Sequence, residues 1–426
     1  MVPPNGEGPL DPIRCLRRTT LCYDKKSGRS ALMIAVGVGH SEDPRTAYAA
    51  RAAADQAIAA AGVDRADLIL VFATIPHAPT YPVMVEALRA ATQAPHLIGC
   101  SALGVLTTAG EITGAPAIAV LALRSPDISF TPFLARDLNG RDEAVGRRIG
   151  RTLKASVDAS SLLTILPDTL NLQEGALLAG LRHELGAVPI VGGGASEDGS
   201  LRRTFVMCGN EVESNAVAGL LWTGRFTHSI TATQACTPIG RPCVVTKASG
   251  HTIEELEGRP AVEVLAHLLR QHPDGASLGP GTLFLGVPAD RAQTALVNGE
   301  YLVRNILGID PIRGALTVAE EIVEGQIAGF VVKGSEPARQ DLAHALADAA
   351  RVHQGCPPAF GLYFNCCGRG APLYGEDNVD VTAIRKTFGD IPLIGFSTYT
   401  EIGPIMGVPH LLTYTGVLTL IGPPPA

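Results

Sequence analysis

One arrangement of residues occurs three times along this chain of 426 residues and constrains its fold more than any other feature. Each copy has a run of apolar residues, a loop, a segment with helical spacing, and a second apolar run that ends in glycine. The copies span residues 68–99, 161–192 and 359–395. Three such copies indicate an internal repeat, and each of them predicts a β-loop-α-β unit.

In a β-loop-α-β unit with a right-handed crossover, the two strands run parallel and end at the same edge of the sheet. Ligands of α/β proteins bind at this carboxyl edge. The repeat therefore predicts a small-molecule pocket there, with Cys100, Ser196 and Ser397 at equivalent strand ends. The alternative is that the glycine of each copy only permits a tight turn after a buried strand.

The segments outside the copies follow other patterns. Leu32–Val38 is a short apolar run and Pro44–Gly62 is alanine-rich with helical spacing, which predicts a strand and then a helix. His228–Gln234 alternates threonine with apolar residues, as in an antiparallel strand with one solvated face. We therefore predict an α/β (mixed α+β) fold of two lobes, built from the repeated units, with mixed sheets flanked by helices.

The apolar pattern lapses over His251–Gly258, which places the boundary between the lobes there. We predict a flexible N-terminal segment at residues 1–30, an N-terminal lobe at 31–250 and a C-terminal lobe at 251–426. Hydrophobic residues make up 46% of the chain, which is enough to bury large cores and excludes a disordered protein.

Charge and hydropathy exclude several classes of partner. The 34 basic and 41 acidic residues give a net charge of -7 without a basic block, so we expect no nucleic-acid partner. No stretch approaches the roughly 18 apolar residues of a membrane span, and Met1–Arg18 lacks the apolar core of a secretory signal. We expect a cytoplasmic protein. Its nine cysteines include no Cys-x-x-Cys, which argues against a zinc ribbon or a thioredoxin-type site.

The first two copies supply four candidate ligand-binding residues. Cys100 and Ser101 follow the first glycine, and Glu111 comes shortly afterwards. Backbone N–H groups and a hydroxyl at this place could receive a polar ligand group. The alternative for Cys100 is a small buried hydrophobic side chain. Ser196 follows the glycine of the second copy.

The third copy is richer in polar residues after both of its strands. Arg369 offers five donors in a planar fork that suits a carboxylate, and Glu401 offers an acceptor for an amine. An amino-acid-like zwitterion would satisfy both. The alternative is that Arg369 and Glu401 pair with each other and hold the two loops together. The candidates in this copy are Asn365, Cys366, Arg369, Phe396, Ser397, Thr398 and Glu401.

A thiol-dependent enzyme is an alternative to a binding protein. Cys100 or Cys366 could act as a nucleophile if a base lay within reach, but neither stands in a local catalytic signature. The eleven histidines are scattered without the spacing of metal ligands. We therefore select no catalytic residue and no metal site.

Several motifs, taken together, resemble the FIST family over about Ala31 to Leu418. In the N-terminal region they are Gly99–Ala102, Gly104-Val105, Glu111-Ile112, Pro189–Gly193, Ala195-Ser196 and Gln234–Gly240. In the C-terminal region they are Phe364–Gly370, Pro392–Phe396 and Glu401–Pro404. The family pattern usually has arginine where this chain has Thr237 and glycine where it has Thr400. If that arginine helps to hold an anionic ligand, Thr237 argues against the same ligand in this chain.

The resemblance implies an intracellular sensory protein of signal transduction, with an N-terminal and a C-terminal FIST region. Amino acids are proposed as ligands for many members, and haem-linked nitric oxide sensing for some. Kinase or chemoreceptor modules of other members would not fit in the remaining residues, so output would pass through a separate signalling protein. We predict a stand-alone small-ligand sensor without a cofactor. The alternatives are a thiol-dependent enzyme and a haem-based nitric oxide sensor.

Overall fold

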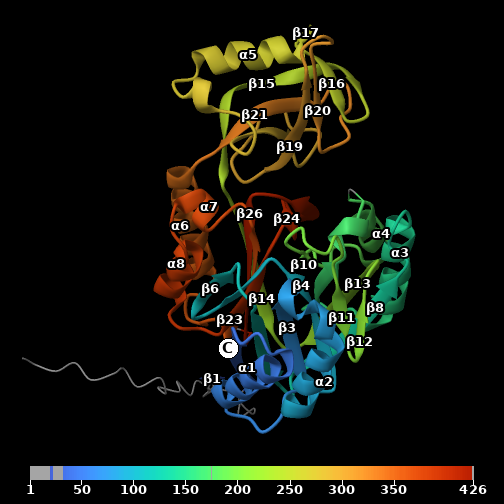
Figure 1. Ribbon diagram of the computed structural model, residues 1–426, viewed down its shortest axis with the longest axis vertical. Coiled ribbons are helices and arrows are strands. Elements are labelled where there is room, and N and C mark those ends of the chain that lie inside the picture. The colour runs from blue at the N-terminus through green and yellow to red at the C-terminus, as the bar shows by residue number, and fades with distance from the viewer. Residues whose placement is uncertain (1–19, 23–31, 174, 425–426) are drawn as a thin grey trace, which may run out of the picture.

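The computed structural model describes residues 20–22, 32–173 and 175–424. The predicted flexible segment at residues 1–30 lies outside these ranges, except for β1 (Thr20–Cys22). Four mixed or antiparallel sheets flanked by helices confirm the predicted mixed α+β fold. In Figure 1 a smaller part with α5 lies above a larger body, in which pairs of helices surround the strands. None of the described helices is both long and apolar enough to cross a lipid bilayer.

All three predicted β-loop-α-β units form, and the two strands of each unit are parallel neighbours. The first unit is β3 (Leu68–Thr74), α2 (Tyr81–Thr92) and β4 (His96–Ala102). The second is β9 (Leu162–Pro167), α4 (Ala176–Leu185) and β10 (Ile190–Gly193). The third is β22 (Phe360–Cys366), α8 (Val379–Phe388) and β23 (Leu393–Thr398).

The glycine of each unit lies inside a strand, which corrects the prediction that it forms a turn. Both β4 and β23 continue for three residues beyond their glycines, Gly99 and Gly395. A Cβ atom at Gly99 would lie 2.0 Å from the carbonyl oxygen of its neighbour in the parallel strand. The corresponding distances are 1.9 Å at Gly192 and 1.7 Å at Gly395. Glycine occurs in each copy because the two backbones leave no room for a side chain.

The strand register also corrects the predicted equivalence of Cys100, Ser196 and Ser397. Counted from the glycines, Cys100 corresponds to Phe396, and Ser397 corresponds to Ser101. Because alternate residues of a strand point to opposite faces, an offset of one residue moves a side chain across the sheet. Cys100 and Phe396 therefore both face the centre of the molecule.

The first unit belongs to a sheet of order β1-β2-β7-β3-β4-β11-β12. Its remaining strands are β2 (Leu32–Ser41), β7 (Ile118–Arg124), β11 (Val206–Cys208) and β12 (Glu211–Glu213). Helix α1 (Thr46–Ala61) packs closely on β2 because its buried side is alanine and β2 has Gly37 and Gly39. A Cβ atom at Gly37 would lie 2.3 Å from the Ala57 oxygen. The predicted strand and alanine-rich helix are thus confirmed.

The second and third units each belong to a sheet of six strands, again with two helices on the outer face. The second sheet has the order β25-β24-β10-β9-β13-β8 and carries α3 and α4; the third has the order β14-β26-β22-β23-β5-β6 and carries α6 and α8. The bounds are β8 (Ile128–Arg136), β13 (Ala216–Gly224), β24 (Glu401–Ile405), β25 (Val408–Leu412) and α3 (Asp142–Leu153) in the second sheet, and β5 (Gly104–Thr107), β6 (Gly110–Thr113), β14 (Thr227–Gln234), β26 (Thr415–Gly422) and α6 (Ser335–Val352) in the third.

Each unit is followed by a β-hairpin that pairs with the sheet of another unit. The hairpin β5–β6 follows the first unit and pairs with β23 of the third. The hairpin β24–β25 follows the third unit and pairs with β10 of the second, and β11–β12 follows the second unit and pairs with β4 of the first. Strand pairing thus crosses the predicted lobe boundary at residues 250 and 251. The exchange ties the three units into one ring of sheets.

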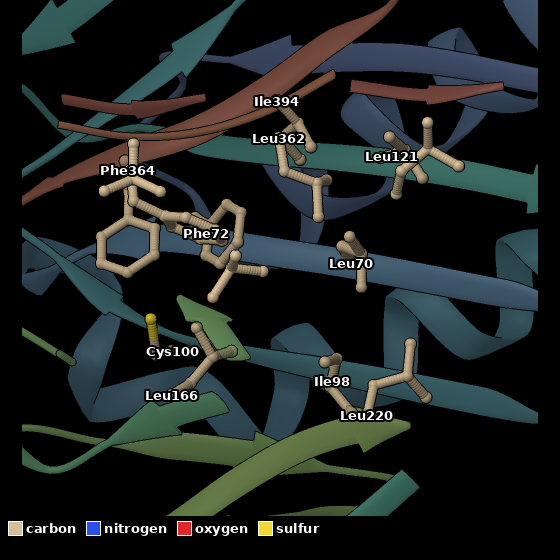
Figure 2. Close-up of a cluster of buried hydrophobic side chains, with 14 of the residues drawn as sticks. Leu70, Phe72, Ile98, Cys100, Leu121, Leu166, Leu220, Leu362, Phe364 and Ile394 are labelled. Carbon is tan, nitrogen blue, oxygen red and sulfur yellow. The ribbon is translucent and has the colours of Figure 1, made fainter. Parts of the chain in front are cut away.

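The inner faces of the three sheets enclose a common hydrophobic core. Figure 2 shows that Phe72 of β3, Cys100 of β4, Leu166 of β9 and Phe364 of β22 point into it. The rings of Phe72 and Phe396 lie 4.5 Å apart between centroids. Because large apolar side chains of all three units fill this core, it fixes how the carboxyl edges of the units meet.

The fourth sheet is a barrel of six strands that lies outside the ring. The whole sheet has seven strands in the order β15-β21-β18-β19-β20-β16-β17. An additional pairing of β15 with β16 closes the first six of them into the barrel, and β17 pairs with β16 beside it. Helix α5 covers one side of the barrel. The bounds are β15 (Cys236–Ser249), β16 (Thr252–Leu256), β17 (Arg259–Pro260), α5 (Ala261–Gln271), β18 (Leu283–Pro288), β19 (Tyr301–Asp310), β20 (Ala315–Val318) and β21 (Ile327–Lys333).

Candidate functional site

A cavity of about 400 Å³ lies where the carboxyl ends of the first and third units meet. Thr74 and Ala102, the last residues of β3 and β4, line it from the first unit. Cys366 and Ser397 line it from the third unit, and Asp198 adds a wall from the segment after β10. The first and third copies therefore share one cavity, which we call the edge pocket.

The edge pocket gathers some of the predicted ligand-binding residues and leaves out others. Five of the predicted residues line it: Glu111, Asn365, Cys366, Arg369 and Ser397. Six are not among its lining residues: Cys100, Ser101, Ser196, Phe396, Thr398 and Glu401. Each of these six is buried elsewhere, between or within the units.

Glu111 lies on β6, a strand of the hairpin that follows the first unit and pairs with β23 of the third unit. Its backbone N–H donates a hydrogen bond of 2.6 Å to Asn378 Oδ1, which fixes the hairpin against the start of α8. Burial first, and then the nearby carboxylates Asp380 and Asp377, raise the pKa of the Glu111 carboxyl to about 7, while the charge of Arg369 opposes this shift. Its Oε1 atom is buried without a hydrogen-bond partner in the described part of the chain.

Asn365 and Ser397 are direct neighbours on β22 and β23, and they point to the same side of the third sheet. The exposed fraction of Asn365 is only 1%, yet its Oδ1 atom has no hydrogen-bond partner among the described residues. A buried acceptor of this kind costs free energy unless a donor reaches it. The edge pocket thus contains two buried oxygen atoms, on Glu111 and Asn365, that lack donors.

Arg369 pairs with Asp380, so the alternative of an Arg369–Glu401 pair was wrong. Its Nε and Nη2 atoms donate to the two carboxylate oxygens of Asp380 at 2.9 and 3.1 Å. Both side chains have an exposed fraction of 0%. The hydroxyl groups of Tyr363 and Tyr374 donate to the same carboxylate at 2.8 Å. These bonds and the Arg369 charge hold the pKa of Asp380 below its usual value despite burial.

Glu401 lies on β24, fully buried beside Cys366. Burial raises the pKa of its carboxyl well above the usual value, and Cys366 adds to this effect. Its Oε2 atom accepts a hydrogen bond of 3.2 Å from the Thr415 N–H, whereas Oε1 has no partner in the described structure. Glu401 therefore sits one layer behind the pocket and not in its wall.

Three predicted hydroxyl residues join the units to one another. Ser196 Oγ and Thr398 Oγ1 are 2.9 Å apart, and Thr398 also donates to the Gly194 carbonyl at 2.7 Å. Ser101 Oγ accepts a bond of 3.0 Å from the Phe205 N–H. These contacts connect the second unit to the third and to the first. The hydroxyl groups are thus used in packing the ring of units.

The two thiols that we predicted as candidate nucleophiles are deeply buried. Burial raises the pKa of Cys100 well above its usual value, and the neighbouring Cys367 thiol together with burial does the same at Cys366. Cys367 differs, because a hydrogen bond from Cys366 lowers its pKa and its side chain is half-buried. It also lines the edge pocket.

Cys367 is expected to react with iodoacetamide at pH 7.5 at least about tenfold faster than Cys100 or Cys366, because the thiolate is the reactive form. Peptide mass spectrometry of partly alkylated protein measures each rate separately. The variant Cys367→Ser should lose the labelled peptide and leave the slow rate of Cys100 unchanged. Faster labelling of Cys100 would revive the predicted thiol nucleophile at that position.

Several residues of the site carry no local signal in the sequence. Asp380, the partner of Arg369, belongs to α8 and lies eleven positions further along the chain. Ile75 and Pro76 of the 3-10 helix η1 (Ile75–Thr80) line the pocket because η1 follows β3 at the carboxyl edge. The predicted loop after each first strand was the one signal that could have located them.

The lining of the edge pocket is acidic. Its lining includes Glu111, Asp198 and Asp377, while the charge of Arg369 is balanced by Asp380. No histidine is among the described residues that line it, whereas the thiols of Cys366 and Cys367 are. Among the described residues, no three or more His, Cys, Asp or Glu side chains lie together in a way that could hold a metal ion. The arrangement suits a small ligand that carries hydrogen-bond donors and positive charge.

Two domain models of one protein family together match most of the chain. Residues 67–259 match the FIST N domain and residues 261–404 match the FIST C domain. An uncharacterized protein of Mycobacterium tuberculosis strain H37Rv is 33% identical over 393 residues, which cover 91% of this chain and 99% of that protein. An uncharacterized protein of Mycobacterium bovis is 30% identical over 389 residues, which cover 90% and 98% respectively.

Among solved structures, a cyanuric acid hydrolase from A. caulinodans aligns over 92% of this chain and 100% of that chain. The TM-score is 0.37 and the sequence identity is 8%. This likeness is too low to bear on the activity or the ligand of the present chain.

Proposed function

Because this chain belongs to the FIST family, whose domains are associated with sensing in signal transduction, we propose that it is a sensory protein that binds a small amine-bearing metabolite, such as an amino acid, in the edge pocket. The signal would pass to a separate partner protein. The observation that carries this proposal is the pair of buried acceptors, Glu111 Oε1 and Asn365 Oδ1, which have no donor in the described structure.

The charges of the pocket favour a cationic group on the ligand. Glu111, Asp198 and Asp377 line the cavity, and the positive charge of Arg369 is already neutralised by Asp380. An ammonium group supplies three donors and a positive charge, so it would satisfy the two buried acceptors and offset the surplus of carboxylates. This argument concerns the amine of an amino acid more than its carboxylate.

The remainder of the pocket can accommodate the rest of such a molecule. Ile75, Leu103 and Tyr399 contribute apolar wall, which suits a carbon skeleton. For a carboxylate, the lining offers donors that include the Ser397 hydroxyl, the Asn365 side-chain NH2 group and Nη1 of Arg369, whose bond to the Thr233 carbonyl is long at 3.5 Å. The volume of about 400 Å³ suits a small metabolite rather than a macromolecule.

The proposal is tested by thermal unfolding of the full chain with each of the common amino acids and with simple amines. A ligand that binds only the folded state raises the melting temperature by mass action. For each ligand that does so, its N-acetylated form serves as a matched control, because acetylation removes the ammonium charge. Glu111→Gln and Asn365→Leu should abolish the shift, whereas Glu86→Gln, on the exposed side of α2, should preserve it. A folded protein that responds to none of these compounds would contradict the proposal.

Amine binding is expected to weaken by about tenfold between pH 8 and pH 6. The pKa of Glu111 is about 7, so roughly one carboxyl in ten is ionised at pH 6, and a neutral carboxyl attracts a cation less. Affinity should therefore rise as pH increases through 7 and level off above pH 8. Isothermal titration at several pH values measures it. Glu111→Gln should leave any residual affinity independent of pH over this range, and an unchanged pH profile in that variant would assign the titration to another group.

A further inference from the structure

A second cavity, of about 420 Å³, lies between the barrel and the second unit, on the other side of the segment that joins β23 to β24. Tyr399 of this segment lines the edge pocket, and its neighbour Thr400 lines the second cavity. The walls come from Arg182 of α4, His410 of β25 and Arg304 of β19. No part of the proposed amine site uses these residues.

The charge of the second cavity is opposite to that of the edge pocket. Three arginines line it, Arg182, Arg291 and Arg304, against two carboxylates, Glu320 and Glu321. Arg304 already forms an ion pair with Glu320. Arg182 and Arg291 form no ion pair with any residue that the structure describes, so their charges remain available at the mouth of the cavity.

His410 adds an unsatisfied polar atom to the same cavity. Its Nε2 atom is buried and has no hydrogen-bond partner in the described part of the chain. Burial lowers the pKa of His410 to about 4, and the charges of Arg304 and Arg182 lower it in the same direction, while Glu320 opposes them. The ring is therefore neutral near pH 7, and a neutral imidazole can still donate one N–H to an oxyanion.

We propose that this second cavity binds a small, multiply charged oxyanion, a phosphate-bearing or polycarboxylate metabolite, through Arg182, Arg291 and His410. Guanidinium groups recognise phosphate and carboxylate oxygens by charge-assisted hydrogen bonds, and an enclosed imidazole N–H would complete the set. The site joins two parts of the fold, because Arg291 and Arg304 belong to the barrel region, Arg182 to α4 of the second unit, and His410 to the hairpin β24–β25 that pairs with the sheet of that unit. The ligand would thus bridge the barrel and the ring of units.

The probes are inorganic pyrophosphate and citrate, each compared with sodium chloride at equal ionic strength. At least one of them should raise the melting temperature of the full chain, and the one that acts identifies the anion class.

Arg182→Gln and Arg291→Gln, at two exposed arginines, should each raise the dissociation constant about tenfold, as expected for one lost charge-assisted hydrogen bond. His410→Gln tests the enclosed nitrogen. Arg270→Gln, an exposed arginine of α5 away from the cavity, is the matched control and should bind normally.

Two results would overturn the proposal. One is the absence of any shift with both probes in folded wild-type protein. The other is a shift that persists unchanged in all three cavity variants, because the anion would then bind elsewhere. Glu111→Gln should retain the anion response, so a failure of the amine proposal and a failure of this one remain distinguishable.

Discussion

Replacement of Gly395 by alanine is expected to lower the free energy of unfolding by about 3 kcal/mol. The new Cβ atom would lie 1.7 Å from the Tyr363 carbonyl oxygen and 2.6 Å from its carbon. β22 cannot move away, because it is hydrogen-bonded to β23 on one side and to β26 on the other. The clash must therefore disturb the central parallel pair of the third unit. Urea unfolding of the variant and of wild type measures the difference.

Gly279→Ala is the matched control for this substitution. Gly279 lies in a loop before β18, and a Cβ atom there would have no heavy atom within 4 Å. Its unfolding midpoint should stay close to that of wild type. Gly99→Ala should behave like Gly395→Ala, since the equivalent clash in the first unit is at 2.0 Å. If Gly395→Ala and Gly279→Ala were equally stable, the close approach of the two strands would not be what requires glycine.

Replacement of Asp380 by alanine is expected to destabilise the protein by about 4 kcal/mol, the range for breaking a buried ion pair from one side. The guanidinium of Arg369 would keep its charge with no counter-charge within bonding distance, in a site where both side chains are inaccessible to water. The hydroxyl groups of Tyr363 and Tyr374 would lose their acceptor as well. Chemical unfolding followed by circular dichroism measures the loss.

Asp390→Ala is the matched control, because Asp390 pairs with Arg385 at 2.8 Å on the surface, where both side chains are nearly half exposed. Solvent screens such a pair, so its loss should leave the midpoint almost unchanged. The double variant Asp380→Ala with Arg369→Met should recover part of the stability lost in Asp380→Ala, since it removes the uncompensated charge. A double variant no more stable than the single one would show that packing, and not the buried charge, dominates the cost.

The architecture of the units followed from the sequence because its signals are local. Alternating apolar runs, helical spacing and the final glycine are all contained within about thirty residues, and all three parallel pairs form as predicted. The pairing of each hairpin with the sheet of another unit was not predictable in this way. The pairing of β5 with β23 joins residues nearly three hundred positions apart, and nothing in the sequence of either strand specifies its partner.

The candidate site shows the same limit at the scale of single side chains. Cys100 and Phe396 were predicted as pocket residues, yet they face the central core, because their strands extend past the glycine and side chains alternate between the two faces. Ser397, the residue after Phe396, and its register partner Asn365 on β22 line the pocket instead. Because both strands continue for three residues beyond their glycines, the residues predicted to form one loop are divided between the two faces of the sheet.

The choice of partner for Arg369 was also beyond the sequence. Glu401 and Asp380 are both acidic and both follow Arg369 in the third unit, so either could have paired with it. The fold places Asp380 on the first turn of α8 within 2.9 Å of the guanidinium and turns Glu401 into the layer behind Cys366. This difference decides that Arg369 is held by the protein, and it makes the edge pocket acidic.

Patterns within the sequence were enough to predict the three units, their parallel strands and the membership of the FIST family. The units depend on apolar and helical periodicity within short segments, and the family membership depends on the resemblance of short motifs. Three further features are visible only in the folded molecule. The carboxyl edges of the first and third units share one cavity, and Glu111 of the hairpin β5–β6 lines it. Two buried oxygen atoms there have no hydrogen-bond donor among the described residues. Such facts depend on distances between segments far apart in the chain, and those distances exist only after the three sheets have packed around their common core.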